Sequence, residues 1–246
     1  MQRVPSSLGT SPWPSETFLA RLSESSRQVL LALGVMHTYS ANHVMMRQGE
    51  SGNLILVVIH GLVKVSARAE NGTESLLAVR VRGDVIGDMA VLDGSTRSAT
   101  ATTCGVTVAR LIKGDIFLDY LRRHSSAALT LSTLMSDRLR WANQRRLEFA
   151  GYDSDVCLAR LLLAVAARHG RPSPEGIDLG IPLTQVELGG LIGAKESTVQ
   201  KILRDLSARG LVRTGHRRVI IVDLSSLAAF ANLDPLPPKN HSANPD

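Results

Sequence analysis

The chain has 246 residues, enough for two domains, and 44% of them are hydrophobic, as in an ordinary folded protein. Its formal net charge of +6 permits an anionic partner without identifying one, and its two cysteines, Cys104 and Cys157, match no metal-binding spacing. The N-terminus has no apolar signal core, and no apolar run reaches the ~18 residues of a membrane helix. We therefore expect a cytoplasmic protein without a membrane partner.

The N-terminal part of the chain changes from disorder to helix to β-structure. Residues 1–14 are rich in Pro, Ser and Gly and are predicted to be disordered, and residues 15–34 follow a helical period behind Ser15 as N-cap. Short β-branched runs then alternate with glycine-marked turns; the predicted strands are Leu54–Ile59, Leu62–Ser66, Leu76–Val81 and Thr107–Leu111. Strands this short and evenly punctuated predict a small closed β-domain at residues 15–124.

A helical period returns after residue 114, with a short helix predicted at 116–121 and a long one at 125–149. The apolar residues of the long helix cover more than one narrow stripe, which is typical of a helix that packs on its own domain and on a second copy. We assign residues 125–150 as a dimerisation helix of a homodimer. The alternative is a helix that packs only within its monomer. Gly151-Tyr152-Asp153 interrupts the pattern and is the predicted hinge.

The C-terminal third contains a helix-turn-helix pattern. After a predicted helix at 155–169 and a loop at 170–176, Thr184 and Glu187 have the spacing of a capping box, which starts a helix. Gly193 lies where a tight turn needs a residue that tolerates positive φ. In the next helix Val199, Ile202, Leu203 and Leu206 face inward. This spacing predicts a helix-turn-helix, whose second helix fits the DNA major groove.

Residues 211–222 predict a β-hairpin wing with its turn at Thr214-Gly215-His216 and cations at its tip. Between Leu183 and Val222, seven Lys and Arg oppose three Asp and Glu, so this segment's +4 is most of the chain's excess charge. Such cations bind DNA phosphates, while side chains that reach base edges give specificity. We therefore predict a domain for double-stranded DNA at residues 151–233, followed by a Pro-rich tail at 234–246. A purely structural three-helix module is the alternative.

The stretch LTQVELGGLIGAKESTVQKILRDLSARGLV resembles the helix-turn-helix of the CRP/FNR family of bacterial regulators, and the resemblance spans about residues 37–223. It implies an α+β fold with an N-terminal β-roll of the cyclic-nucleotide-binding type, a long dimerisation helix and a C-terminal winged helix-turn-helix. The implied DNA contacts are Thr184, Lys195, Glu196, Ser197, Gln200, Lys201, Arg204, His216, Arg217 and Arg218.

The base-reading positions by this analogy are Glu196, Ser197 and Lys201, with Gln200 beside them. The best-known family members have Arg and Glu at the first two positions and Arg at the last, so only the last keeps its charge here. A bidentate Arg–guanine contact is absent at the first position, and we expect a different operator. Lys195 replaces the Ser that usually begins the recognition helix, which weakens or moves that cap.

Residues 87–99, GDMAVLDGSTRSA, resemble the phosphate-binding cassette of the same family. The resemblance implies a cyclic nucleotide, cyclic AMP or cyclic GMP, held by Gly87, Asp88, Met89, Ala90, Arg97, Ser98 and Asn143. Arg97 can neutralise a cyclic phosphate with forked hydrogen bonds. Asp88 stands where the family has Glu, and Ala142-Asn143 stand where it has a base-contacting Thr-Ser pair, which bears on adenine recognition. Alternatively, Arg97 only ties the roll together.

These features predict a ligand-gated transcription regulator that binds pseudo-palindromic operators as a dimer, with RNA polymerase as a further partner if it activates transcription. One alternative is a ligand-independent regulator whose roll is a scaffold. Another is a nucleotide-sensing module that acts on a partner protein. The motifs GxSxG and HExxH are absent, so we predict no enzyme and no catalytic residue. The histidines have no metal spacing, so no metal is predicted.

Overall fold

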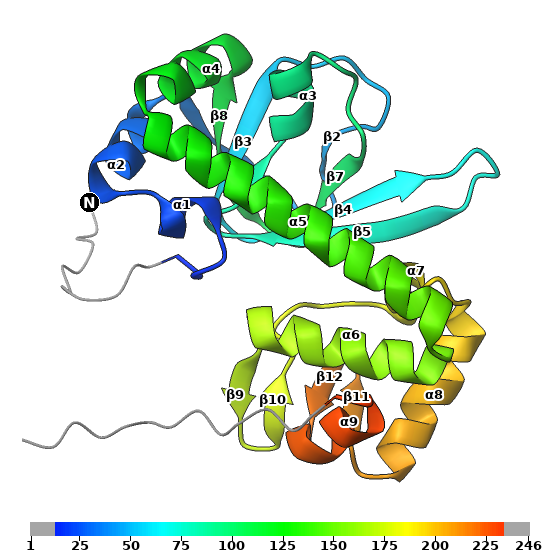
Figure 1. Cartoon of the computed structure of the whole chain (residues 1–246). Coiled ribbons are helices and arrows are strands. Elements are labelled where there is room, and N and C mark those ends of the chain that lie inside the picture. The colour runs from blue at the N-terminus through cyan, green and yellow to red at the C-terminus, as the bar shows by residue number, and fades with distance from the viewer. Residues whose placement is uncertain (1–12, 234–246) are drawn as a thin grey trace, which may run out of the picture. The chain divides into compact units, whose positions relative to one another are not determined.

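The structure is a computed structural model that describes residues 13–233, and the chain forms two compact units divided between Asn143 and Gln144 (Figure 1). The division falls inside the long helix α5 (Ser125–Gly151), so about two turns of this helix belong to the C-terminal unit. The segments predicted to be disordered lie outside the described residues, except for Trp13 and Pro14. Within residues 13–233, no helix is both long and apolar enough to cross a membrane.

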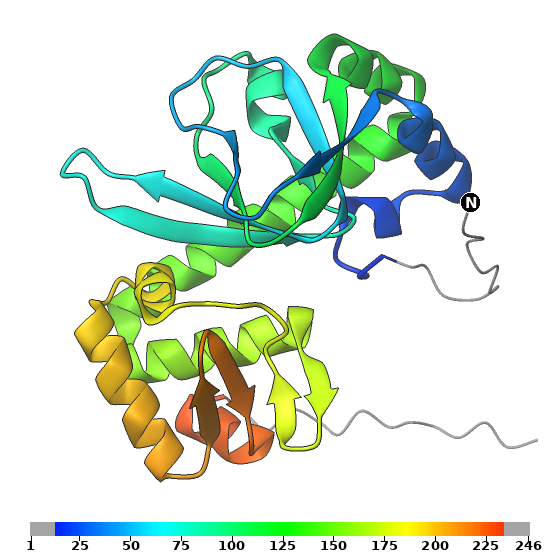
Figure 2. The ribbon, with the colours of Figure 1, turned by 180° about the vertical axis from the view of Figure 1, so that it is seen from behind.

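The N-terminal unit contains two four-stranded antiparallel sheets, ordered β1-β8-β3-β6 and β2-β7-β4-β5 (Figure 2). Their strands are β1 (Val35–Tyr39), β2 (Val44–Met46), β3 (Leu54–His60), β4 (Leu62–Arg68), β5 (Glu74–Val81), β6 (Val85–Ile86), β7 (Thr100–Thr103) and β8 (Thr107–Lys113). The four strands expected from the sequence are present as β3, β4, β5 and β8. The prediction of a small β-domain is therefore confirmed.

Strand β3 separates two hydrophobic cores because successive side chains of a strand point to opposite faces. Ile55 and Val57 pack with Phe18, Phe117 and other buried side chains of the helices. Leu56 and Val58 face the second sheet, where they belong to a cluster with residues of β4 and β7. Burial on both faces explains why this strand is continuously apolar in the sequence.

The helices of the N-terminal unit cover one face of the first sheet; they are α1 (Phe18–Arg21), α2 (Glu24–Ala32), α3 (Asp88–Asp93), α4 (Gly114–Arg123) and the first part of α5. The single helical segment predicted at 15–34 is wrong. Leu22 is extended and ends α1, and Ser23 starts α2 by accepting a hydrogen bond from the N–H of Ser26. The N-cap of α1 is Thr17, not Ser15.

The C-terminal unit combines helices with a four-stranded sheet ordered β11-β12-β10-β9. Its other elements are α6 (Ser154–His169), β9 (Arg171–Ser173), β10 (Gly176–Asp178), α7 (Gln185–Ile192), α8 (Glu196–Ala208), β11 (Val212–Gly215), β12 (Arg218–Ile221) and α9 (Leu224–Phe230). The loop predicted at 170–176 is wrong, because the chain forms the hairpin β9-β10 there. Pairing of β10 with β12 stabilises a hairpin too short to be read from its own sequence.

The predicted wing is confirmed, but its turn is shorter than predicted and begins two residues later. Gly215 pairs with Arg218, so the turn consists of His216 and Arg217 instead of residues 214–216. Arg217, the second residue of the turn, adopts a φ of +53°, in the left-handed region that a non-glycine residue seldom occupies. The cations at the tip are therefore placed by the turn itself.

A buried charge cluster joins the end of α5 to α6 and α9. The Glu148 carboxylate, with 3% of the residue exposed, lies 2.6 Å from the guanidinium of Arg145 and 3.7 Å from that of Arg160. Arg160 also donates to the carbonyls of Ala231 at 2.8 Å and Asn232 at 2.9 Å. Burial lowers the pKa of Arg145, and the charge of Glu148 opposes that shift. This cluster anchors the last turns of α5 to α6 and to the end of α9.

Candidate DNA interface and ligand cassette

The first helix of the helix-turn-helix starts with the predicted capping box, which the structure confirms. Thr184 Oγ1 accepts a hydrogen bond from the Glu187 N–H at 3.2 Å, and Glu187 Oε2 accepts one from the Thr184 N–H at 2.8 Å. Each side chain satisfies a backbone donor of the other residue. The helix ends at Gly193, whose φ of +65° is the left-handed conformation expected for that position.

Gly189 is a residue of this motif that the sequence interpretation missed. A Cβ atom at Gly189 would lie 2.4 Å from the carbonyl oxygen of Ala194. The two backbone segments are close because the Ala194 N–H donates a hydrogen bond to the Gly189 carbonyl at 2.9 Å. No side chain fits between these two backbone segments. The only feature of the sequence that could have identified Gly189 is its position one helical turn before Gly193.

Replacing Gly189 with alanine is expected to displace the turn between α7 and α8 and to cost about 1–3 kcal/mol of stability. Thermal unfolding and hydrogen exchange of the α7 and α8 amides would measure the effect. Gly105→Ala is the matched control, because nothing lies within 4 Å of a Cβ at that position. Equal protection of α7 and α8 in both variants would contradict the close approach of Gly189 and Ala194.

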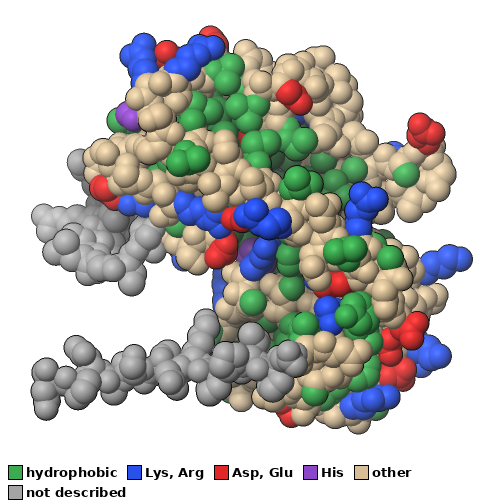
Figure 3. All heavy atoms as spheres, viewed as in Figure 1, with side chains coloured by type: hydrophobic (Ala, Val, Ile, Leu, Met, Phe, Trp, Pro, Cys, Tyr) green, Lys and Arg blue, Asp and Glu red, His purple; other side chains and the backbone are tan. Residues whose placement is uncertain are grey.

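The second helix, α8, separates apolar and polar side chains as the sequence predicts. Its buried residues are Val199, Ile202, Leu203 and Leu206. Its exposed residues include Glu196, Ser197, Gln200, Lys201 and Arg204, and Figure 3 shows Lys, Arg and acidic side chains on this edge of the C-terminal unit. The N-cap residue Lys195 makes no side-chain cap, in agreement with the expectation. Contact of the exposed face with DNA stays a prediction.

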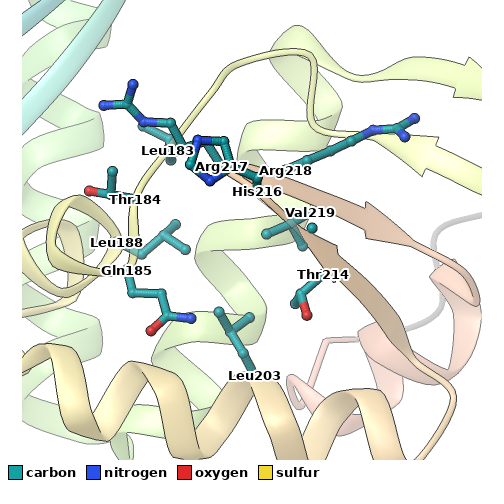
Figure 4. Close-up of a pocket in the computed structure, with 11 residues that line it drawn as sticks. Leu183, Thr184, Gln185, Leu188, Leu203, Thr214, His216, Arg217, Arg218 and Val219 are labelled. Carbon is teal, nitrogen blue, oxygen red and sulfur yellow. The ribbon is translucent and has the colours of Figure 1, made fainter.

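The wing tip and the start of α7 line one pocket of about 280 Å³ (Figure 4). Gln185 of α7 and its N-cap Thr184 line it together with Leu203 of α8 and residues 214–219 of the wing. The fold thus brings Thr184 together with His216, Arg217 and Arg218, which are distant in the sequence and all exposed or half-buried. These cationic and polar groups form one continuous surface with the start of the helix-turn-helix.

The cassette in the N-terminal unit is organised around the buried side chain of Arg97. Its Nη1 donates to the carbonyl of Gly87 at 3.0 Å and its Nη2 to that of Leu54 at 2.8 Å. Gly87 has a φ of +86° and begins α3, whose first turn contains Asp88, Met89 and Ala90. Burial lowers the pKa of Arg97, and the charge of Asp88 opposes this shift. The two backbone hydrogen bonds hold the guanidinium in place inside the cassette.

Ser98 lies at the exposed side of the cassette, with its Oγ 3.9 Å from the sulfur of Met89. Asn143, in contrast, is exposed at the end of the N-terminal unit and forms none of the described hydrogen bonds that hold the cassette. The structure thus brings together six of the seven predicted ligand residues. Asn143 has none of the described contacts with them.

Arg138 of α5 is a cassette residue that the sequence interpretation missed. Its Nη1 lies 2.8 Å from Oδ2 of Asp88, and its Nη2 donates to the carbonyl of Val85 at 3.0 Å. Asp88 is only 4% exposed, so this ion pair is shielded from water. The two residues are 50 positions apart, and the only local signal is that Arg138 lies about one helical turn before Ala142.

The most exposed large apolar side chains of α5 are Leu129 at 69%, Leu139 at 62% and Leu147 at 67%. At about 100° per residue, Leu129 and Leu147 point in the same direction and Leu139 lies within about 80° of them. Figure 3 shows hydrophobic side chains gathered on the N-terminal unit around this helix. Pairing of two such helices would remove these leucines from water.

Two family models match the chain in the order of these two units. Residues 36–124 match the cyclic nucleotide-binding domain, and residues 158–230 match the Crp-like helix-turn-helix domain. The chain belongs to the CRP/FNR family. It is therefore a DNA-binding transcription regulator with a cyclic-nucleotide-binding domain, and this family is not enzymatic.

Similar proteins of this CRP/FNR family cover most of the chain. The CRP-like cAMP-activated global transcriptional regulator of Mycobacterium tuberculosis is 29% identical over 193 residues, which is 78% of this chain and 86% of that protein. The cAMP-activated global transcriptional regulator CRP of Salmonella typhimurium is 27% identical over 192 residues, 76% and 89% of the two chains. The structure of FixK2 from Bradyrhizobium japonicum matches with a TM-score of 0.70 at 20% identity. The match covers 83% of this chain and 99% of FixK2, which shows the shared fold.

Proposed function

We propose that this CRP/FNR regulator binds a cyclic nucleotide in the cassette and pseudo-palindromic DNA as a homodimer. The observation that carries the ligand part is the buried guanidinium of Arg97 beside the ion pair of Asp88 and Arg138. Forked donors from Arg97 suit a cyclic phosphate, Ser98 adds a hydroxyl, and Asp88 is a carboxylate acceptor for a ribose hydroxyl. The cAMP-activated relatives support this choice of ligand class.

The exposed leucines of α5 support the homodimer, since pairing two such helices would bury them. Two subunits would present two recognition helices, with Glu196, Ser197, Gln200 and Lys201 toward base edges. Lys195, Arg204 and the wing residues His216, Arg217 and Arg218 would contact phosphates. RNA polymerase is a further partner if the regulator activates transcription. We propose that residues 15–124 form the β-roll, residues 125–150 the dimerisation helix and residues 151–233 the DNA-binding domain.

A second candidate is a regulator whose roll is only a scaffold. One observation favours it: Arg97 and Asp88 already have partners within the chain, so the cassette is held together without a ligand. In that case Arg97 is a structural residue, and DNA binding would not respond to nucleotides.

Isothermal titration with cyclic AMP and cyclic GMP separates the two candidates. For the wild-type chain we expect saturable binding of one of them, and for Arg97→Gln a loss of about 1.5–3 kcal/mol, roughly 10- to 150-fold, because a charge-assisted contact is removed. Arg122→Gln, on the exposed face of α4, is the matched control. Flat titrations of the wild type with both nucleotides, together with unaltered operator binding, would leave the scaffold as the correct candidate.

A further inference from the structure

We propose that Arg171, at the start of β9, binds the DNA backbone beside the phosphates reached by the wing. This proposal rests on the proposed DNA binding by the C-terminal unit, and it extends that interface onto the hairpin β9-β10. Its ligand is a single phosphodiester group of the operator backbone in each half-site. Neither the helix-turn-helix motif nor the wing motif includes this residue.

The sheet places Arg171 near the wing through Asp178 of β10. Asp178 is the register partner of Arg171 on one side and of Ile220 in β12 on the other. Its Oδ2 accepts a hydrogen bond from Nε of Arg218, and its Oδ1 accepts one from the Gly180 N–H at 2.8 Å. Both carboxylate oxygens are thus used within the protein. Asp178 organises Arg218 and leaves the terminal nitrogens of that guanidinium for a phosphate.

The pKa of Asp178 is also affected by both arginines. Partial burial acts to raise it, but the hydrogen bonds from Gly180 and Arg218 and the positive charges of Arg218 and Arg171 bring it below its usual value. Arg171 therefore lies close enough to act electrostatically on the carboxylate that holds Arg218.

Arg171, Arg217 and Arg218 line a shared open pocket of about 420 Å³, together with Asp178 and the backbone around Gly180. Three arginines against one aspartate give this pocket a net charge of +2. Figure 4 shows the side chains of Arg217 and Arg218 leaving the wing tip in opposite directions, so the basic groups are spread along the surface. A chain of phosphates, with one charge after another, complements such a row.

The hairpin β9-β10 is polarised so that its basic end faces the wing tip. Glu175, in the hairpin turn at the other end, pairs with Arg213 near the start of β11 at 2.9 Å. Arg171, opposite Asp178, lies at the open end near the tip residues Arg217 and Arg218. This continuity with the wing, and the acidic residue at the far end, favour DNA over a partner protein.

The test measures DNA affinity of the full chain as a function of salt. The probe is a duplex of about 40 base pairs carrying a site that the wild type selects from random sequences. At ~0.1 M salt we expect Arg171→Ala to bind about five- to twentyfold more weakly, and its log–log salt slope to be smaller by about 2, one contact per subunit. Arg171→Lys should keep most of the slope because it keeps the charge. Arg122→Ala, from the N-terminal unit, controls for loss of an exposed arginine.

A second measurement locates the contact. Duplexes with one neutral methylphosphonate at successive backbone positions should reveal a position in each half-site that weakens the wild type but not Arg171→Ala. If Arg171→Ala bound the selected site with the same affinity and the same salt slope as the wild type, the Arg171 contact would be refuted. The proposed DNA binding by the C-terminal unit would still stand. Absence of any salt-dependent binding by the wild type would overturn both this inference and the proposed DNA binding.

Discussion

Replacement of Lys201 by alanine is expected to weaken binding of the preferred operator by about 2–6 kcal/mol per dimer, while binding of random DNA changes little. Lys201 is exposed on α8, two residues after the buried Val199, and a lysine in a major groove contributes about 1–3 kcal/mol of discrimination at one guanine. Two subunits double that figure. Equilibrium titration of the full chain with a selected site and with a random duplex, at one salt concentration, measures the difference.

Arg218→Ala provides the contrasting pattern for this experiment. Its guanidinium lies at the wing tip and is held by Asp178, so it suits a phosphate and not a base edge. Affinity for all sequences should fall together, and the salt slope should become smaller. Equal losses on specific and random DNA for Lys201→Ala would contradict its assignment as a base-reading residue.

Replacement of Glu148 by alanine is expected to destabilise the C-terminal unit by about 3–5 kcal/mol. The change leaves the buried guanidinium groups of Arg145 and Arg160 without their shared carboxylate, and an uncompensated buried charge is costly. Hydrogen exchange of the α6 and α9 amides reports this unit separately, which matters because a chain of two units need not unfold in one step.

Asp205→Ala is the control for Glu148→Ala, since it removes an exposed carboxylate from α8 and should change stability by less than ~0.5 kcal/mol. Glu148→Gln should fall between the two, because an amide can still accept the hydrogen bond from Gln144 but carries no charge. Unaltered exchange of α6 and α9 in Glu148→Ala would show that the cluster contributes nothing to the stability of this unit.

Local sequence patterns were sufficient wherever an element is specified by residues that lie within a few turns of one another. The capping box of Thr184 and Glu187, the turn at Gly193 and the buried face of α8 were all predicted. Each depends on a spacing of three or four residues, which a helix repeats whatever surrounds it. The wing was predicted from a turn between two short strands, although the turn was predicted to begin two residues too early.

The cassette illustrates the opposite case. GDMAVLDGSTRSA identified Arg97 and Asp88, but neither the carbonyls that hold Arg97 nor the pairing of Asp88 with Arg138 has a local signature. Leu54 and Arg138 are 43 and 50 positions away from their partners. Such contacts exist only after the strands and α5 have packed.

By itself, then, the sequence determined the kind of protein: a β-domain, a long helix with more than one apolar stripe and a basic winged helix-turn-helix. These follow from periodicity, glycine turns and charge, which act over short distances along the chain. Only the tertiary structure decided that Arg138 pairs with Asp88, that Arg160 joins Glu148 to the end of α9, and that β9-β10 completes the sheet beside the wing. The physical reason is that buried ion pairs and short strands are stable only next to partners that folding brings from distant parts of the chain.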